Sequence, residues 1–310
     1  MSSDGSSPAA ALPATVRFLE RDWLSCNQVL FDDGDGSATV VDTGYLKHAD
    51  VTAALLRHAL GGRRLARIVN THLHSDHCGG NARLFAEHGC TIVVPAADRA
   101  AVDTWDERAL TYSMTGQRCA RFTAHASLAD GDRITMGGFE WQALAAPGHD
   151  PHSLVLWCAG LRTLVSADVL WRDGFGVIFP ELGGESGFAE QQAILERIAS
   201  LPVARVLPGH GPAFDDVGAA LERAFSRLAA LRADPRRNAR NALKVLVKFA
   251  LLDRERLEPQ QLLAIASGAQ ALENAAGLLG LDLPTAIAWA TDALVAQGEL
   301  RREGGLVVNA

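Results

Sequence analysis

The 310-residue sequence lacks the features that mark several classes of protein. Its five cysteines are scattered, and no two of them form a C-x-x-C pair. An odd, scattered set argues against a disulfide framework and favours a reducing compartment. No run of 18 apolar residues is present, so we expect no transmembrane helix, and the N-terminus lacks the basic and apolar segments of a signal peptide. The sequence therefore predicts a cytoplasmic protein with no membrane partner.

The chain also has no excess of positive charge. It carries 29 Lys and Arg against 36 Asp and Glu, a formal net charge of −7. This balance gives little support for nucleic-acid binding, which a basic patch usually marks, although it does not exclude it. The hydrophobic share of 48% is enough for a sizeable core.

The pattern of residue types divides the sequence into three regions. Residues 1–14 are rich in Ser, Ala and Pro and predict a flexible tail. Residues 15–232 alternate short β-prone runs with helical segments, which is typical of an α/β domain. Residues 233–310 are mostly helical and end in a hairpin about Gly304-Gly305, so we expect a small winged-helix-like C-terminal domain.

The run His72-Leu73-His74-Ser75-Asp76-His77 places four metal-binding side chains within six residues, directly after a short β-prone segment. Imidazole is the commonest ligand of borderline metals, and aspartate supplies an anionic oxygen. Alternate residues at a strand end share a face, so His72 and His74 can serve one ion. Asp76 and His77, in the turn that follows, can serve a second.

Three further candidates lie downstream, each in a loop after a predicted strand. They are His149 in APGH, Asp168 in SAD and His210 in LPGHGP. Loops that follow strands are where α/β enzymes gather functional groups. We therefore expect these three side chains to join the first cluster.

These motifs, together with VVDTG at 40–44, resemble those of the metallo-β-lactamase superfamily in the same order, and most closely its glyoxalase II-like branch. The resemblance implies an αββα sandwich, in which two mixed sheets pack face to face with helices outside. It also implies a binuclear site: His72, His74 and His149 would bind the first metal, Asp76, His77 and His210 the second, and Asp168 would bridge the two.

Such a site predicts a metal-dependent hydrolase. Two divalent ions that share a bound water lower its pKa, and the resulting bridging hydroxide attacks the substrate. Zinc is the first choice for His and Asp ligands, and iron or manganese also suits them. We expect catalytic roles for Asp76, Asp168 and His152, the last as a donor behind the ligands or an acid for the leaving group.

The sequence narrows the substrate only in part. The resemblance to metallo-β-lactamases proper fails at Asp168, which they lack, and Trp171 stands near the place where the lactonase branch carries a Tyr. Trp171 and Phe175 belong to the apolar run WRDGFGVIF, which predicts either a substrate-binding loop or core. The hypothesis is hydrolysis of a thioester or ester of a small acyl substrate.

The C-terminal region leaves alternatives open. Its predicted recognition helix, Pro284–Gln297, has no Lys or Arg, which is poor for reading DNA. A stripe of Arg236, Arg240, Lys244 and Lys248 instead predicts either a solvated face or a clamp for an anion. The alternatives are a metal-dependent endoribonuclease or phosphodiesterase and, third, a non-catalytic metal-binding module. The region could also mediate a homodimer.

Overall fold

The structure is a computed structural model that describes residues 11–310. The predicted tail over 1–14 therefore lies mostly outside the described residues.

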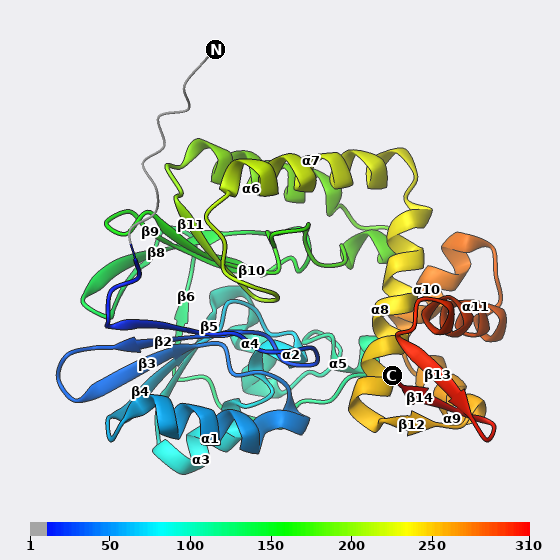
Figure 1. The fold of residues 1–310 in the computed structure, drawn as a ribbon, viewed down its shortest axis with the longest axis horizontal. Coiled ribbons are helices and arrows are strands. Elements are labelled where there is room, and N and C mark those ends of the chain that lie inside the picture. The colour runs from blue at the N-terminus through cyan, green and yellow to red at the C-terminus, as the bar shows by residue number, and fades with distance from the viewer. Residues whose placement is uncertain (1–10) are drawn as a thin grey trace.

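The first sheet has six strands in the order of the sequence (Figure 1). Strands β1 to β3 are antiparallel, and β3 to β6 run parallel. The strands are β1 (Val16–Leu19), β2 (Gln28–Asp32), β3 (Ser37–Val41), β4 (Arg64–Val69), β5 (Thr91–Pro95) and β6 (Ala126–Leu128). Because parallel strands end at the same edge, the loops after β3, β4 and β5 lie together.

The second sheet has five strands in the order β11-β10-β9-β8-β7. Its strands are antiparallel except for the pair β10 and β11. They are β7 (Arg133–Met136), β8 (Phe139–Ala145), β9 (Leu154–Cys158), β10 (Thr163–Ala167) and β11 (Arg205–Pro208). This order makes β8, β10 and β11 end at one edge.

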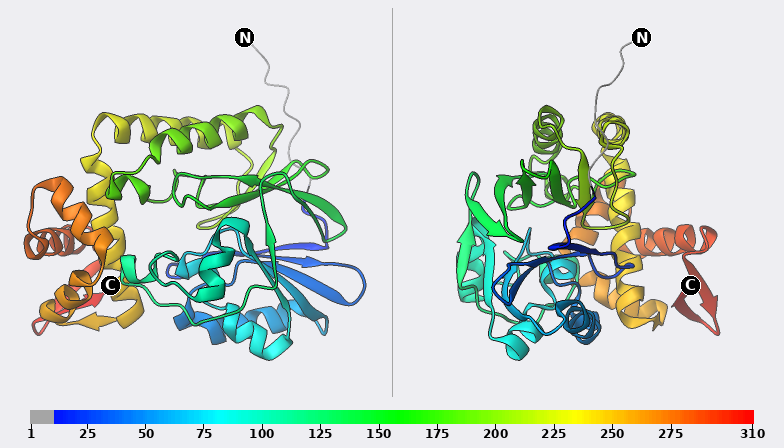
Figure 2. Two further views of the ribbon diagram at one scale, coloured as in Figure 1. Left: turned by 180° about the vertical axis from the view of Figure 1, so that it is seen from behind. Right: turned by 60° about the vertical axis from the view of Figure 1, so that its left-hand side comes forward.

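The two sheets pack face to face between layers of helices (Figures 1 and 2). Buried side chains such as Phe31 and Trp141, whose rings meet edge-on at 5.2 Å, fill the space between the sheets. The outer helices are α1 (Ala49–Leu60) and α3 (Asn81–His88) on the first sheet, and α6 (Phe188–Ser200) and α7 (Val217–Ala233) on the second. The predicted αββα fold is confirmed.

The C-terminal residues form a helical region beside one end of the sandwich (Figure 1). Its long helix α8 (Arg236–Arg254) runs along that end and shares a core with Val177 and Leu182 of the sandwich. The other elements are β12 (Arg256–Leu257), α9 (Pro259–Ser267), α10 (Gln270–Leu279), α11 (Leu283–Ala296), β13 (Leu300–Glu303) and β14 (Leu306–Asn309). Strands β12, β14 and β13 form a small sheet. The winged-helix-like character of this region and the domain boundary after residue 232 stay predictions.

Several short elements have no counterpart in the sequence-based prediction. They are β1, β6, α2 (Ser75–Cys78), α4 (Arg99–Thr104) and α5 (Tyr112–Thr115). Such elements hold too few residues to show a period, and tertiary packing stabilises them.

Over residues 11–310, no single helix is long and apolar enough to cross a membrane. Only α9 and α10 taken together pass that test of length and composition, and they are bent by 97°.

Candidate metal centre

The seven predicted metal ligands come from loops at one end of both sheets, the end that faces α8. All seven side chains are buried. His72 and His74 follow β4, Asp76 and His77 lie in α2, and His149, Asp168 and His210 follow β8, β10 and β11. The shared direction of these strands therefore brings together residues that lie up to 138 positions apart in the sequence.

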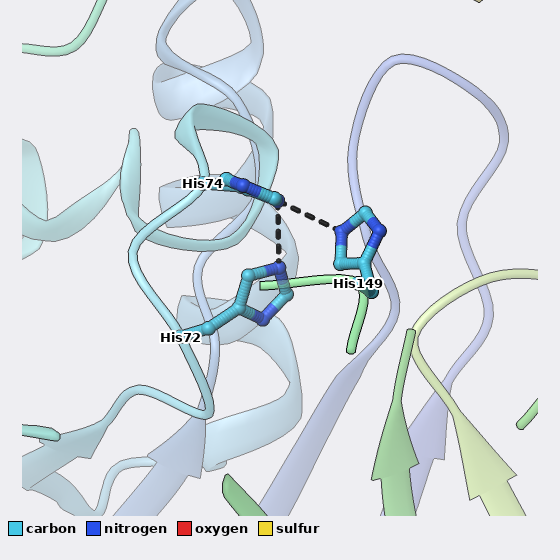
Figure 3. A group of neighbouring side chains, drawn as sticks. All are labelled: His72, His74 and His149. Carbon is cyan, nitrogen blue, oxygen red and sulfur yellow. Dashed lines mark hydrogen bonds between the residues drawn. The ribbon is translucent and has the colours of Figure 1, made fainter. Parts of the chain in front are cut away.

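Three of these histidines converge on one point (Figure 3). His74 Nδ1 lies 3.2 Å from His72 Nε2 and 2.8 Å from His149 Nε2. The other nitrogen of His149, Nδ1, bonds to the carbonyl oxygen of Val177 at 2.6 Å. Since that bond requires a proton on Nδ1, the His149 Nε2 lone pair is left free for a ligand.

The remaining four side chains form a second group next to the first. Asp168 Oδ1 lies 3.3 Å from His77 Nε2 and 3.7 Å from His210 Nε2, and Asp76 Oδ2 lies 3.2 Å from His210 Nε2. The second oxygen of Asp168, Oδ2, lies 3.4 Å from His149 Nε2 in the first group. The Asp168 carboxylate therefore has one oxygen facing each group.

This donor set fits two metal ions. Four ligand atoms around a tetrahedral ion at ~2.0–2.1 Å lie roughly 3.3 Å apart, close to most of these separations. The buried Nε2 atoms of His77 and His210 make no hydrogen bond, although carboxylate oxygens lie near them. Buried polar atoms are seldom left without a partner. Because these nitrogen and oxygen atoms surround a common centre, a bound cation would be the partner of all of them.

The electrostatics of His72 and Asp168 agree with this arrangement. Burial, followed by the neighbouring His77 and His74, holds the pKa of His72 well below its usual value. Burial acts to raise the pKa of Asp168, but His77 and His210 hold it well below the usual range. Neutral imidazoles and an ionised carboxylate are the forms that bind metal. The pKa of His77 differs: burial acts to lower it, but Cys26, Asp168 and Asp42 hold it well above its usual value.

A hydrogen-bonded chain behind the ligands orients two of them. His77 Nδ1 donates to Asp42 Oδ2 at 2.8 Å. The same carboxylate accepts bonds from the backbone N–H of Thr71 at 2.9 Å and from its hydroxyl at 2.7 Å. Thr71 Oγ1 in turn lies 3.1 Å from His72 Nδ1. Asp42, which lies in the VVDTG motif, thus supports one ligand of each group.

His152 lies apart from the two groups. Its side chain is 41% exposed, does not line the cleft, and its Nδ1 lies 2.6 Å from Asp98 Oδ1. Its backbone N–H donates to Asp150, whose Oδ2 lies 3.4 Å from His74 Nε2. His152 can therefore act on the ligands only through neighbours, and a direct catalytic role for it stays a prediction without support from its position.

A cleft of about 210 Å³ opens onto the two groups. Trp171 lines it, with its indole Nε1 3.3 Å from Asp168 Oδ1. Phe175 also contributes to the wall but is fully buried, so it belongs to the core as well. Trp171 thus faces the cleft and Phe175 belongs mainly to the core, and a role of either residue in substrate binding stays a prediction.

The cleft includes residues that sequence reasoning missed. Trp23 stacks on His210 with ring centroids 4.5 Å apart, and it meets Trp171 edge-on. Arg227 and three residues of α8 also line the cleft, the last being Asn241, Val245 and Phe249, together with Phe179 from the end of the predicted apolar run. The α8 residues recur every four positions, which marks one helix face. That spacing is visible in the sequence, but nothing local indicates what the face meets.

Comparisons with known proteins agree with the fold and the motifs. A hydroxyacylglutathione hydrolase from Methylococcus capsulatus is 30% identical over 177 residues, 56% of this chain and 57% of the relative. One from Halorhodospira halophila is 30% identical over 206 residues, 66% of this chain and 64% of the relative. The chain thus spans less than two thirds of the length of these relatives.

Among solved structures, a beta-lactamase domain protein from Burkholderia ambifaria matches with a TM-score of 0.59 at 19% identity, covering 99% of this chain and 97% of the other. A metallo-beta-lactamase family protein from Thermus thermophilus matches with a TM-score of 0.57 at 17% identity, covering 97% and 100%. At these identities the matches show the fold alone, and they extend over the C-terminal helical region.

The family model of the metallo-beta-lactamase superfamily matches residues 21–210. That range includes all seven clustered side chains, the strands that carry them and Asp42 behind them. The chain therefore belongs to the metallo-beta-lactamase superfamily.

Proposed function

We propose that this protein is a binuclear metal-dependent hydrolase that acts on a thioester or ester of a small acyl substrate. One observation carries the proposal: two groups of buried imidazole and carboxylate donors share Asp168 at the end of an apolar cleft. We assign His72, His74 and His149 to one ion and Asp76, His77 and His210 to the other, with Asp168 between them. Zinc is the metal we expect first, with iron or manganese as alternatives.

Bound divalent ions would supply an activated water and polarise the acyl carbonyl. Burial acts to raise the pKa of Asp76, but its close neighbour His210 and then His77 lower it. The carboxylate therefore stays ionised near neutral pH and can accept a hydrogen bond from the attacking water. Trp23 stacks on His210 and Trp171 meets the same ring edge-on, so the two indoles cover one side of the second group.

The substrate class rests on the relatives and on the cleft wall. The matched relatives are named hydroxyacylglutathione hydrolases, which supports a thioester. Trp171, Phe179 and Val245 line the cleft and suit an apolar acyl chain. A partly apolar cleft of this size holds a small molecule more readily than a folded polynucleotide.

The alternative of an endoribonuclease or phosphodiesterase depends on the basic stripe of α8. Two of its four members already have partners: Arg240 lies 3.6 Å from Asp234, and Lys248 lies 3.0 Å from Glu299. Paired cations neutralise less phosphate charge. We therefore rank this function below acyl hydrolysis and include its substrates in the test.

The test combines metal analysis with a substrate panel. Purified protein is assayed for bound zinc, iron and manganese, and for hydrolysis of thioesters, lactones, phosphodiesters and RNA. We expect two metal equivalents and thioester or ester hydrolysis. His72→Ala should lose about one equivalent and at least ~100-fold in activity, because it removes a ligand rather than a group behind one. His58→Ala, an exposed histidine of α1, is the matched control.

A His72→Ala variant that keeps both metals and full activity would sink the proposal. Hydrolysis of RNA or phosphodiesters without hydrolysis of acyl substrates would instead favour the alternative.

A further inference from the structure

Arg227 is a cation without an anionic partner in the wall of the cleft. It lies in α7, is half-buried, and its guanidinium sits 4.8 Å above the centre of the Phe175 ring. Within residues 11–310, that ring is the one polar or aromatic contact of its guanidinium that the structure records. Burial lowers the pKa of Arg227, and no nearby charge acts on it in either direction.

The neighbouring arginine of the same helix behaves differently. Arg223, one turn earlier, is exposed, donates to the carbonyl oxygen of Arg172 at 2.9 Å and lies 3.7 Å from Asp173. A guanidinium presents five donors in a rigid fork, and those of Arg227 still reach solvent because the side chain is only half-buried. The Phe175 ring occupies none of them, because a ring face accepts no conventional hydrogen bond. The five donors of Arg227 are thus available to a ligand.

The loop after Asp168 relates Arg227 to the metal ligands. A side chain at Gly174 would lie 2.7 Å from Arg227, and one at Gly176 would collide with the His149 ring, so the loop contacts both. Because two residues of chain span at most ~7 Å, the guanidinium and the His149 ring lie no more than roughly 12 Å apart. Both line the same cleft, together with the amide-bearing Asn241 of α8.

From this placement we propose that Arg227 is the binding site for a carboxylate of the substrate, within roughly 12 Å of the His149 ring. The planar fork of arginine matches a carboxylate with two parallel hydrogen bonds. The proposal rests on the proposed hydrolase function and specifies its substrate: an acyl ester or thioester that carries a second, anionic end. Arg227 thereby selects and orients the substrate and takes no part in bond cleavage.

The first test measures binding without catalysis. The metal-loaded protein is titrated by calorimetry with 6-phenylhexanoate and with its uncharged amide, 6-phenylhexanamide. We expect the acid to bind about tenfold more tightly or better, as a charge-assisted hydrogen bond allows. Arg227→Met should abolish this preference, Arg227→Lys should keep part of it, and the matched control Arg223→Met should keep all of it.

Several outcomes overturn the carboxylate site. Wild-type protein that binds acid and amide equally, or binds neither, removes it. A preference that persists in Arg227→Met places the carboxylate on the metal ions instead. The thermal unfolding of each variant is measured alongside. If Arg227→Met is unstable, Arg227→Lys is compared with the wild-type protein instead, because lysine keeps the charge and lacks the planar guanidinium.

The second test separates this proposal from the hydrolase function. Hydrolysis of 4-nitrophenyl hexanoate is compared with that of the mono-4-nitrophenyl ester of adipate, which has a terminal carboxylate. We expect a KM about tenfold lower for the adipate ester, lost in Arg227→Met while kcat changes little. Hydrolysis of both esters with equal KM overturns the carboxylate site and leaves the hydrolase. No hydrolysis of any ester, with the binding preference intact, overturns the hydrolase and leaves the site.

Discussion

Asp42 has an unusual backbone conformation and a central place behind the metal ligands. Its φ is 59°, in the left-handed region that residues with a side chain rarely adopt. This conformation accompanies the contacts of its carboxylate with His77 and Thr71. The strain is thus local and lies next to the site.

We expect Asp42→Asn to weaken metal binding about 10- to 100-fold with little change in fold. Asparagine tolerates the left-handed conformation but carries no charge to hold the His77 ring in its metal-binding tautomer. Competition with a chelating dye measures the affinity. Asp103→Asn, at an exposed aspartate of α4, is the control, and equal metal affinity in both variants would rule out the supporting role.

The pKa of His149 predicts how acid affects the metal-free protein. Burial and then the neighbouring His74 lower that pKa to about 4, whereas an unfolded histidine titrates near ~6.5. Between these values the unfolded chain binds a proton that the folded chain does not, so stability falls as the pH falls. The loss from His149 is on the order of 2 kcal/mol between about pH 7 and about pH 5.

Urea unfolding of the chelated protein at these two pH values measures the effect. His149→Gln should show a shallower fall, because it removes the group that titrates. Identical falls in the variant and the wild-type protein would contradict the assignment.

At the scale of single residues, the sequence predicted the clustered ligands because each stands in a recognisable motif after a strand. It did not predict Trp23 or Arg227, whose neighbours in the sequence carry no such pattern. Trp23 reaches His210 and Arg227 reaches Phe175 only through packing. A Trp or an Arg at these positions does not by itself indicate a place in the cleft, because that place depends on where the side chain points.

Helix α8 is the element that joins the C-terminal region to the site. Its buried Asn238 donates to the carbonyl oxygen of Ile178 at 2.7 Å and accepts from the Ile178 N–H at 3.2 Å. The side chain thus pairs with the backbone as a strand would, and it holds the loop after Asp168 against α8. The sequence predicted this helix from its period, but not its partner.

Asn238→Ala should therefore destabilise the protein by about 2–4 kcal/mol, because it leaves a buried N–H and a buried C=O without partners. Arg237→Ala, at an exposed position next to it, should change stability by no more than ~0.5 kcal/mol. Urea unfolding of both variants compares them. An Asn238→Ala variant as stable as Arg237→Ala would show that the loop does not depend on this contact.

The whole molecule places its metal ligands on two different sheets. His72, His74 and His77 belong to the first sheet's edge, and His149 and His210 to the second. Metal ions bound to ligands of both sheets connect the two sheets, and they can do so only when the protein is folded. Binding to the native state stabilises it by about 4 kcal/mol when free metal exceeds its Kd ~1,000-fold.

We therefore expect metal removal to lower the Tm by on the order of 10 °C. Differential scanning calorimetry before and after chelation measures the shift, and restoring zinc, iron or manganese one at a time shows which ion recovers it. An unchanged Tm after complete metal removal would mean that the ions do not connect the sheets.

The sequence alone determined the clustered donor set, because its residues stand in short motifs that are local properties of the chain, and the αββα fold was predicted from the resemblance of those motifs to a known family. Only the tertiary structure decided what surrounds the ligands. The loop after Asp168, α7 and α8 are separate in the sequence, and they become one cleft wall because the helical region packs its core against Val177 and Leu182. Contacts between such distant segments depend on how whole layers pack, and no local pattern encodes them.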